Sequence, residues 1–192
     1  MSQSHFIVIG PIQSGKTTFI NQFLKLLKND IPRIGFIEEC IYKNQERIGY
    51  DLILSINESK YQFPFVRLKE RITPDDPNMF KFDNNTIVSV KNLIDNNVKF
   101  NKSPLIYFDE YGRIESKGLG LFSSMKSIIN QVNSQNIPYT TIFTTRKQNL
   151  DFLLNNCKKD FSFTSDPNIL TLPSNEESKE LFIKKINESL VK

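Results

Sequence analysis

Residues 10–17 read Gly-Pro-Ile-Gln-Ser-Gly-Lys-Thr and fit the phosphate-loop pattern G-x-x-x-x-G-K-[ST]. Glycines allow a tight turn whose backbone N–H groups point at phosphate oxygens, and the following helix presents its positive end to the same anion. In such a loop Lys16 bridges the β- and γ-phosphates, Thr17 ligates Mg²⁺ and Thr18 donates to the α-phosphate. The pattern predicts nucleoside triphosphate binding. The expected binding residues are Gly10, Pro11, Ile12, Gln13, Ser14, Gly15, Lys16, Thr17 and Thr18.

Two acids follow a second apolar run, residues 105–108, and are Asp109 and Glu110. A carboxylate at the end of a buried strand, beside a phosphate loop, can hold Mg²⁺ through a water, and we assign this role to Asp109. Glu110 can leave the strand on a different heading and can orient and deprotonate a water in line with the γ-phosphate. The alternative is that both acids begin a solvated loop, but the phosphate loop favours the metal and water roles.

Two arginines are candidates for stabilising negative charge on the transferring phosphoryl group, Arg113 and Arg146. For each, the alternative is an ion pair at the surface. We expect Glu115 to fix the loop after Glu110 rather than to touch substrate. The predicted catalytic residues are therefore Glu110, Lys16 and Arg146, and the predicted metal ligands are Thr17 and Asp109.

The elements that must position these residues alternate between strands and helices. Residues 6–9 form a short apolar run that predicts a strand, and residues 17–27 place apolar side chains at helical spacing. Residues 48–56 alternate with period two, and pairing them with residues 34–41 predicts a β-hairpin. Prolines interrupt residues 61–83, which predicts a short strand and irregular loops.

The remaining predictions complete an α/β pattern. Helices are expected over residues 86–97, around 121–132, over 150–154 and from 174 onward; strands are expected over residues 105–108 and 139–145, and, on a weaker pattern, over 161–163 and 169–172. Strands that alternate with helices imply a layered α/β domain with a mostly parallel sheet, to which the hairpin adds an antiparallel edge.

Composition and length bound the class of protein. The chain has 192 residues, 39% of them hydrophobic and 24% charged, and no visible repeat or linker, so we expect a single domain over residues 1–192. No apolar run approaches the ~18 residues needed to span a bilayer, and the first ten residues do not resemble a signal peptide. Two cysteines exclude a disulfide framework and a four-cysteine zinc site. These features favour a cytoplasmic protein without a membrane partner.

The charge of the chain says less about partners. The net charge is +4 and the pI is about 9.0, but the lysines are scattered rather than clustered. Nucleic acid binding is therefore possible but unsupported, and we expect a monomer that binds ATP, GTP and other nucleoside triphosphates.

Beyond the nucleotide motifs, the sequence resembles the thermophile-type nucleoside-triphosphatases, a family of small P-loop proteins. Residues 35–39 (GFIEE) and 47–51 (RIGYD) are similar to two strands of that family, and residues 109–115 (DEYGRIE) are similar to its D-E-[IV]-G-x-[ML]-E signature. The resemblance covers most of residues 5–156. It implies a three-layer P-loop NTPase core of the RecA or kinase type that hydrolyses nucleoside triphosphates to diphosphates and phosphate, with Mg²⁺ and a loose base preference.

The chain departs from the family pattern at three places. Glu38 stands where the family usually has threonine, residues 61–83 lack a Gly-x-Tyr segment, and residues 164–169 lack an Asn-Arg pair. The resemblance therefore assigns no nucleobase contacts in this chain.

Two alternatives to a hydrolase share the same core. The first is a nucleoside or nucleotide kinase, although such kinases usually carry an arginine-rich lid and only Arg146 follows the helix around 121–132. The second is a nucleotide-gated module whose slow hydrolysis resets binding to a partner, for which residues 61–83 and the basic pI leave room.

Overall fold

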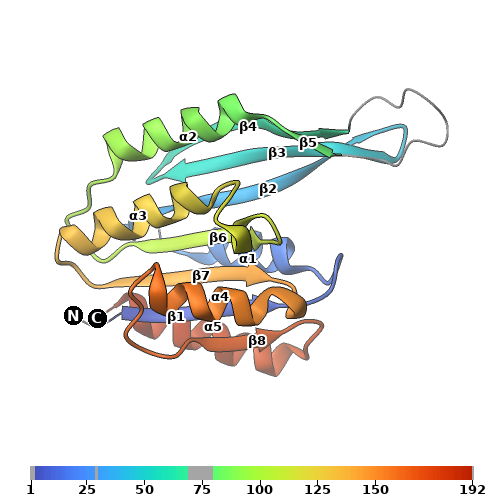
Figure 1. The fold of residues 1–192 in the computed structure, drawn as a ribbon. Helices are drawn as coiled ribbons and strands as arrows, with labels where there is room; N and C mark the ends of the chain where they lie inside the picture. The colour runs from blue at the N-terminus through green and yellow to red at the C-terminus, as the bar shows by residue number, and fades with distance from the viewer. Residues whose placement is uncertain (1–2, 29, 69–79, 192) are drawn as a thin grey trace.

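The computed structural model describes residues 3–28, 30–68 and 80–191 (Figure 1). The strands are β1 (Gln3–Ile9), β2 (Arg33–Lys43), β3 (Glu46–Ile56), β4 (Ser59–Leu68), β5 (Phe80–Phe82), β6 (Leu105–Tyr111), β7 (Tyr139–Thr145) and β8 (Asn168–Thr171). The helices are α1 (Lys16–Leu26), α2 (Asn84–Asn97), α3 (Phe122–Ser134), α4 (Leu150–Lys159) and α5 (Glu176–Leu190), with the short 3-10 turns η1 (Glu115–Lys117) and η2 (Lys147–Asn149).

The eight strands of the described residues form one sheet in the order β5-β4-β3-β2-β6-β7-β1-β8. Strands β2, β6, β7, β1 and β8 pair in parallel, and β3, β4 and β5 continue the sheet as antiparallel neighbours. The predicted mostly parallel sheet with an antiparallel hairpin is confirmed. The antiparallel part extends beyond the hairpin, because β4 and β5 add to its outer edge.

Helices cover both faces of this sheet and complete a three-layer sandwich (Figure 1). Helices α2, α3 and α4 lie on one face, and α1 and α5 lie on the other. Each face has its own apolar core: Val90, Met125 and Leu153 belong to the first, whereas Ile20 and Phe182 belong to the second. Parallel strands buried between two helical layers keep their carboxyl ends at one edge, which is where ligands bind in such sheets.

Two sequence-based predictions about strands are wrong in detail. Strand β4 runs through Pro64, which lies opposite Asp51 next to an irregularity in the pairing with β3, a position where proline is tolerated. Residues 161–163 form no strand, and the rings of Phe161 and Phe163 instead pack into the core beside Phe143. Of the stretch 61–83, for which a short strand and irregular loops are predicted, residues 69–79 lie outside the described part of the chain. Among the described residues, no helix is long and apolar enough to span a membrane.

Gly35 permits the close approach of β2 to β6. A Cβ atom at this position would lie 2.0 Å from the carbonyl oxygen of Tyr107, its partner in the parallel pairing. Because both strands are central, neither can move without disturbing the packed layers. We expect Gly35→Ala to lower the free energy of unfolding by about 2–3 kcal/mol in urea denaturation. The exposed Glu39 on the same strand provides the control, since Glu39→Ala should change stability by less than about 0.5 kcal/mol. An equal stability of the two variants would contradict the steric argument.

His5 on β1 is buried, and its imidazole ring is neutral at pH 7. Its ring stacks on Phe163 with the ring centroids 3.4 Å apart, and its Nδ1 lies 2.9 Å from Thr141 Oγ1. Burial lowers the pKa of His5 from 6.5 to about 4. Between these two pH values the unfolded chain binds a proton at His5 and the native protein does not. Native stability is therefore lost as the pH falls through this window.

Because of His5 alone, we expect the free energy of unfolding to fall by about 3 kcal/mol when the pH is lowered from 7 to 4. The His5→Phe variant removes the titrating group, so its stability should fall less over the same range. Urea denaturation of both proteins at the two pH values measures the difference. Parallel pH profiles for the wild type and the variant would refute the assignment.

Candidate active site

The predicted phosphate loop joins β1 to α1 at the carboxyl edge of the sheet. The Gly10 N–H donates to the carbonyl of Thr145 over 3.2 Å, which ties the start of the loop to the end of β7. Gly15 has a φ of +87°, a left-handed conformation that glycine adopts without strain. A Cβ atom on Gly10 would lie 2.3 Å from Ser14 Oγ and 2.9 Å from the backbone carbonyl oxygen of Leu172. Both glycines of the motif are therefore required by the shape of the loop.

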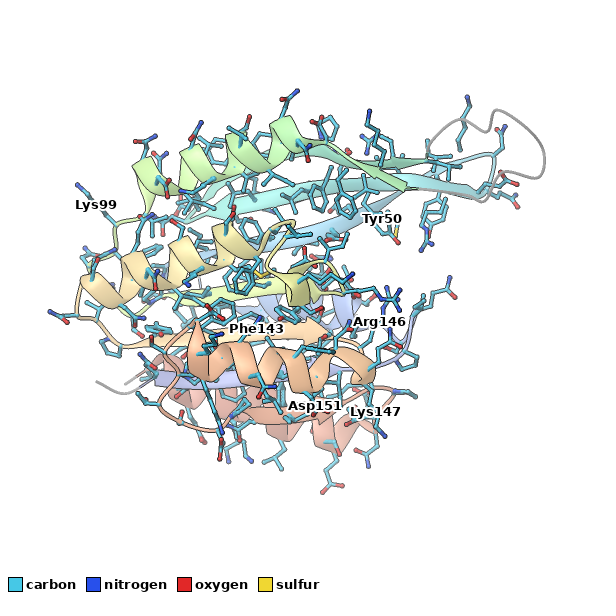
Figure 2. All side chains as sticks on the ribbon, in the orientation of Figure 1. Tyr50, Lys99, Phe143, Arg146, Lys147 and Asp151 are labelled. Atoms are coloured by element: carbon cyan, nitrogen blue, oxygen red, sulfur yellow. The ribbon has the colours of Figure 1, made fainter. Side chains whose placement is uncertain are left out.

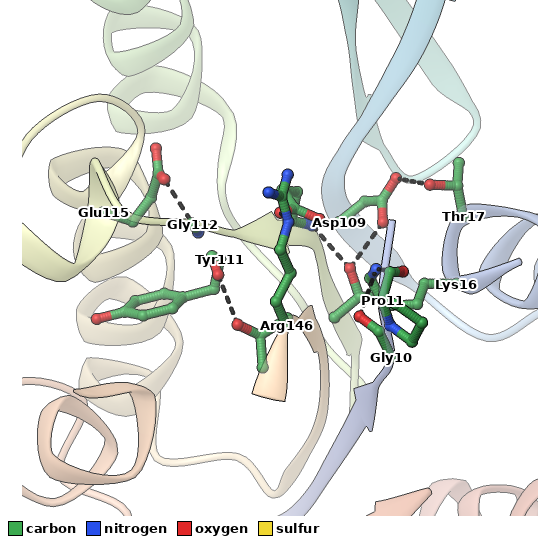
Figure 3. Close-up of polar contacts among 12 residues, drawn as sticks. Gly10, Pro11, Lys16, Thr17, Asp109, Tyr111, Gly112, Glu115 and Arg146 are labelled. Atoms are coloured by element: carbon green, nitrogen blue, oxygen red, sulfur yellow. Dashed lines mark hydrogen bonds and ion pairs between the residues drawn. The ribbon is translucent and has the colours of Figure 1, made fainter. Parts of the chain in front are cut away.

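Lys16 extends its side chain back through this loop. Its ammonium donates to the carbonyl oxygens of Gly10 and Pro11 over 3.0 and 2.9 Å (Figure 3). The side chain is buried, and burial lowers the pKa of Lys16, a shift that the carboxylates of Glu110 and Asp109 oppose. The backbone carbonyls of the loop therefore hold the ammonium group of Lys16 inside the turn.

Asp109 links this loop to the central strands. Its Oδ2 accepts a hydrogen bond from Thr17 Oγ1 over 2.7 Å, and its Oδ1 accepts one from Thr144 Oγ1 over 2.8 Å. Burial raises the pKa of Asp109 to about 6, the two hydroxyl donors oppose this shift, and the nearby Glu110 carboxylate adds to it. The two residues predicted to hold a metal are therefore in direct contact, one from α1 and one from β6.

Glu110 interrupts the extended backbone of β6. It adopts a left-handed backbone conformation with a φ of +65°, which costs a residue with a side chain about 1–2 kcal/mol. Its N–H donates to Thr144 Oγ1 over 2.8 Å, and its Oε1 lies 3.0 Å from Arg146 Nε. This contact is an ion pair without a hydrogen bond from Nε. The partner of Arg146 is thus a site carboxylate.

The loop after Glu110 is fixed by Glu115. This buried carboxylate accepts from the N–H groups of Gly112 and Leu121 over 3.1 and 3.3 Å, which confirms that its contacts are within the loop. Arg113 is exposed, and the described residues include no ion pair to it. Arg113 still lines the same cavity as Glu110.

A cavity of about 690 Å³ brings the predicted site residues together. Its walls include Ile12, Gln13, Ser14, Gly15, Lys16, Thr17, Thr18, Asp109, Glu110, Arg113 and Arg146. Gly10 and Pro11 adjoin it through Lys16. The volume lies within the range of ligand-binding clefts, and the lining combines cations, carboxylates and backbone N–H groups at the carboxyl ends of parallel strands.

The oxygen donors in this cavity fit Mg²⁺. This ion takes oxygen ligands, usually keeps several waters and binds through one or two protein groups together with substrate phosphates. The hydroxyl of Thr17 and the carboxylate of Asp109 provide such a pair. Among the residues that the structure describes, no group of three or more His, Cys, Asp and Glu side chains could hold a metal ion alone. Phosphate oxygens and waters would complete the shell.

Sequence reasoning missed two residues of the site. The hydroxyl of Thr144 donates a hydrogen bond to Asp109 and accepts one from the backbone N–H of Glu110. The sequence feature that could have indicated Thr144 is its position near the end of a predicted strand, two residues before Arg146. Glu38 on β2 lines the cavity, two residues beyond Phe36, which pairs with Phe108 of the adjacent strand β6. Burial raises the pKa of Glu38 well above its usual range, and the carboxylates of Asp109, Glu115 and Glu110 add to the shift.

Comparisons with known proteins show the family and support the fold. The profile of the NTPase family matches residues 5–165. The chain is similar to the solution structure of a human cancer-related nucleoside triphosphatase, at 20% identity and a TM-score of 0.63, with 96% of each chain covered. It is also similar to the crystal structure of THEP1 from the hyperthermophile Aquifex aeolicus, at 15% identity and a TM-score of 0.57, with 98% of this chain and 99% of that chain covered. No curated protein sequence matches significantly.

Proposed function

This chain belongs to the NTPase family, and on that premise we propose that it hydrolyses nucleoside 5′-triphosphates to diphosphates and phosphate with Mg²⁺ and a broad base preference. One observation carries the proposal: Asp109 accepts a hydrogen bond from the hydroxyl of Thr17, and the next residue, Glu110, lines the same cavity. The pair that we propose to hold the metal and the candidate base would therefore act side by side, next to the phosphate loop.

The phosphate chain would lie along the loop and the first turn of α1. Lys16 would exchange the carbonyls of Gly10 and Pro11 for oxygens of the β- and γ-phosphates, since its ammonium already lies inside the turn. Thr17 and Asp109 would hold Mg²⁺, which when bound offsets negative charge on the β- and γ-phosphates. The helix N-terminus would add its unpaired N–H groups to the same anion.

Glu110 would accept a proton from the attacking water. Its strained backbone directs the carboxylate away from Asp109, so the two acids can serve the water and the metal separately. Arg146 lies 3.0 Å from Glu110 and would move toward the γ-phosphoryl oxygens as charge develops on them. The contact also holds the Glu110 carboxylate in place before substrate binds.

A phosphate-release assay over ATP, GTP, CTP and UTP tests this function. We expect release from all four within about tenfold of one another, because the carrying contacts are to phosphate and metal rather than to the base. Excess EDTA should reduce every rate by at least about a hundredfold. Metal-independent release would contradict the metal role of Thr17 and Asp109. A turnover far below that of enzymes, together with nucleotide-dependent capture of a partner, would favour the nucleotide-gated module instead.

A further inference from the structure

The pairing of β6 with β7 is irregular at the two acids. The register of these parallel strands shifts between Phe108 and Tyr111. Two residues of β6, Asp109 and Glu110, therefore lie opposite a single residue of β7, Thr144. Such an extra residue is a β-bulge, and bulges beside active sites re-aim side chains. The left-handed backbone of Glu110 lies within this bulge.

The bulge changes the face of the sheet that β6 reaches. Before it, Tyr107 belongs to the core beneath α1 and α5, and Phe108 belongs to the core beneath α2, α3 and α4. Unbroken alternation would place Tyr111 with Tyr107, but Tyr111 belongs to the core of Phe108. The Tyr111 hydroxyl accepts a hydrogen bond from Asn156 of α4 over 2.7 Å, whereas Asp109 is bonded to α1. The residue inserted between these two lines the cavity.

Thr144 is fully buried opposite the bulge, and its hydroxyl is bonded to both acids. Its Oγ1 donates to Asp109 Oδ1 over 2.8 Å and accepts the backbone N–H of Glu110 over 2.8 Å. The hydroxyl proton and one lone pair are thus used on the carboxylate that we propose to hold the metal and on the backbone of the candidate base. Without this hydroxyl both groups would lose a partner, which is unfavourable for buried polar groups.

The next residue ties the same strand end to the phosphate loop. Thr145 Oγ1 donates to the carbonyl of Tyr111 over 2.6 Å, and the Thr145 carbonyl accepts the N–H of Gly10 over 3.2 Å. Earlier in β7, Phe143 packs in the core, and Arg146 follows the strand at the carboxyl edge of the sheet (Figure 2). The end of β7 therefore joins the packed core to both acids and to the loop.

We propose that Thr144 is a positioning residue for hydrolysis. Its hydroxyl holds the Asp109 carboxylate in contact with Thr17 and fixes the backbone turn from which the Glu110 side chain leaves. One buried group therefore places both the metal carboxylate and the base. The inference rests on the proposed function, since Thr144 acts only through these two acids and does not touch the substrate.

Thr144→Val tests this role, because valine keeps the shape of threonine and lacks the hydroxyl. We expect kcat for ATP at saturating Mg²⁺ to fall at least about tenfold, as is typical when the hydrogen-bond partner of a functional ligand is removed. The Mg²⁺ concentration that gives half of the Mg²⁺-dependent binding of a fluorescent, non-hydrolysable ATP analogue should also rise at least about tenfold. Binding of the same analogue in excess EDTA should be unchanged, because the contacts of the phosphate loop remain.

Two further variants separate positioning from stability. Thr144→Ser restores the hydroxyl and should recover most of the kcat and the Mg²⁺ affinity. The matched control is Thr140→Val, since Thr140 is buried on the same strand and its Oγ1 lies 2.8 Å from Ser189 of α5. Thr140 pairs with Leu105 at the opposite end of the β6–β7 pairing, so its variant should keep the wild-type kcat and Mg²⁺ affinity.

Combination with Glu110→Gln tests whether Thr144 acts through the base. At saturating Mg²⁺, Thr144→Val should lower kcat much less in the Glu110→Gln protein than in the wild type, because the proton acceptor is already lost. An undiminished loss in the Glu110→Gln protein would overturn this role. Equal losses of kcat from Thr144→Val and Thr140→Val would also overturn the inference, because they would reflect stability alone.

The remaining outcomes are equally decisive. Wild-type kcat and Mg²⁺ affinity in Thr144→Val would overturn this inference and leave the hydrolase intact, whereas a wild-type protein that releases no phosphate would overturn both. If Thr144→Val does not fold, Thr144→Ala takes its place. Failure of both to fold while Thr144→Ser folds would assign the hydroxyl to the stability of the sheet and overturn the positioning role.

Discussion

Lys16→Ala is expected to lower kcat/KM for ATP by at least about a hundredfold, the loss typical of removing one donor that stabilises transition-state charge. The ammonium lies within the phosphate loop, 3.0 Å from the carbonyl of Gly10, so no other side chain can take its place there without remaking the turn. Phosphate release under steady-state conditions measures the loss. A nucleotide titration shows how much of it comes from weaker binding.

The control for this variant is Lys25→Ala. Lys25 is exposed in the last turn of the same helix, so it tests loss of a lysine from α1 without loss of the loop contact. We expect that variant to retain wild-type turnover. The thermal unfolding of Lys16→Ala should be followed in parallel, because the loop loses two hydrogen bonds. A folded Lys16→Ala protein that turns over ATP near the wild-type rate would refute the phosphate role of the loop.

Glu110→Gln is expected to bind nucleotide nearly as tightly as the wild type and to lose about 10²- to 10⁴-fold in kcat. Glutamine keeps the length of the side chain and can adopt the same left-handed backbone, but it cannot accept a proton from water. It also loses the ion pair to Arg146, which lies 3.0 Å away. A fluorescent nucleotide measures binding, and single-turnover phosphate release measures the chemical step.

Arg146→Ala separates the two losses that Glu110→Gln combines. It removes the same ion pair and leaves the carboxylate in the cavity, so a smaller loss of kcat is expected than for Glu110→Gln. If Glu110→Gln released phosphate at the wild-type rate, Glu110 would not be the base. If Arg146→Ala matched Glu110→Gln in full, the charge of Arg146, on the γ-phosphoryl oxygens or on Glu110, would matter as much as proton transfer to Glu110.

The phosphate loop and the two acids could be predicted from sequence because their signals are local. Gly15 is required by a single backbone conformation, and Lys16 follows it directly in the chain. The strand before Asp109 could be recognised in the sequence as a short apolar run. Because the carboxyl ends of parallel strands lie at one edge of the sheet, residues that follow neighbouring strands come close together there. The contact between Thr17 and Asp109 then follows from chain topology.

The places of Glu38 and Thr144 at the site could not be predicted because they depend on how the strands pair. Glu38 reaches the cavity only because β2 pairs with β6 so that Phe36 lies beside Phe108. No local sequence pattern indicates that β2 pairs with β6. Pro64 suggested a broken segment, yet the irregular pairing between β3 and β4 accommodates it and lets β4 continue past it to Leu68. Local proline signals were thus overridden by pairing across the sheet.

The most direct test of the account is a crystal structure of this protein with Mg²⁺ and a non-hydrolysable triphosphate analogue. The account predicts the phosphates within the turn of residues 10–17, with the ammonium of Lys16 moved from the loop carbonyls to phosphate oxygens. It also predicts Mg²⁺ on Thr17 and near Asp109, with Glu110 facing the γ-phosphorus. A turn without phosphate, or a metal remote from both Thr17 and Asp109, would contradict it.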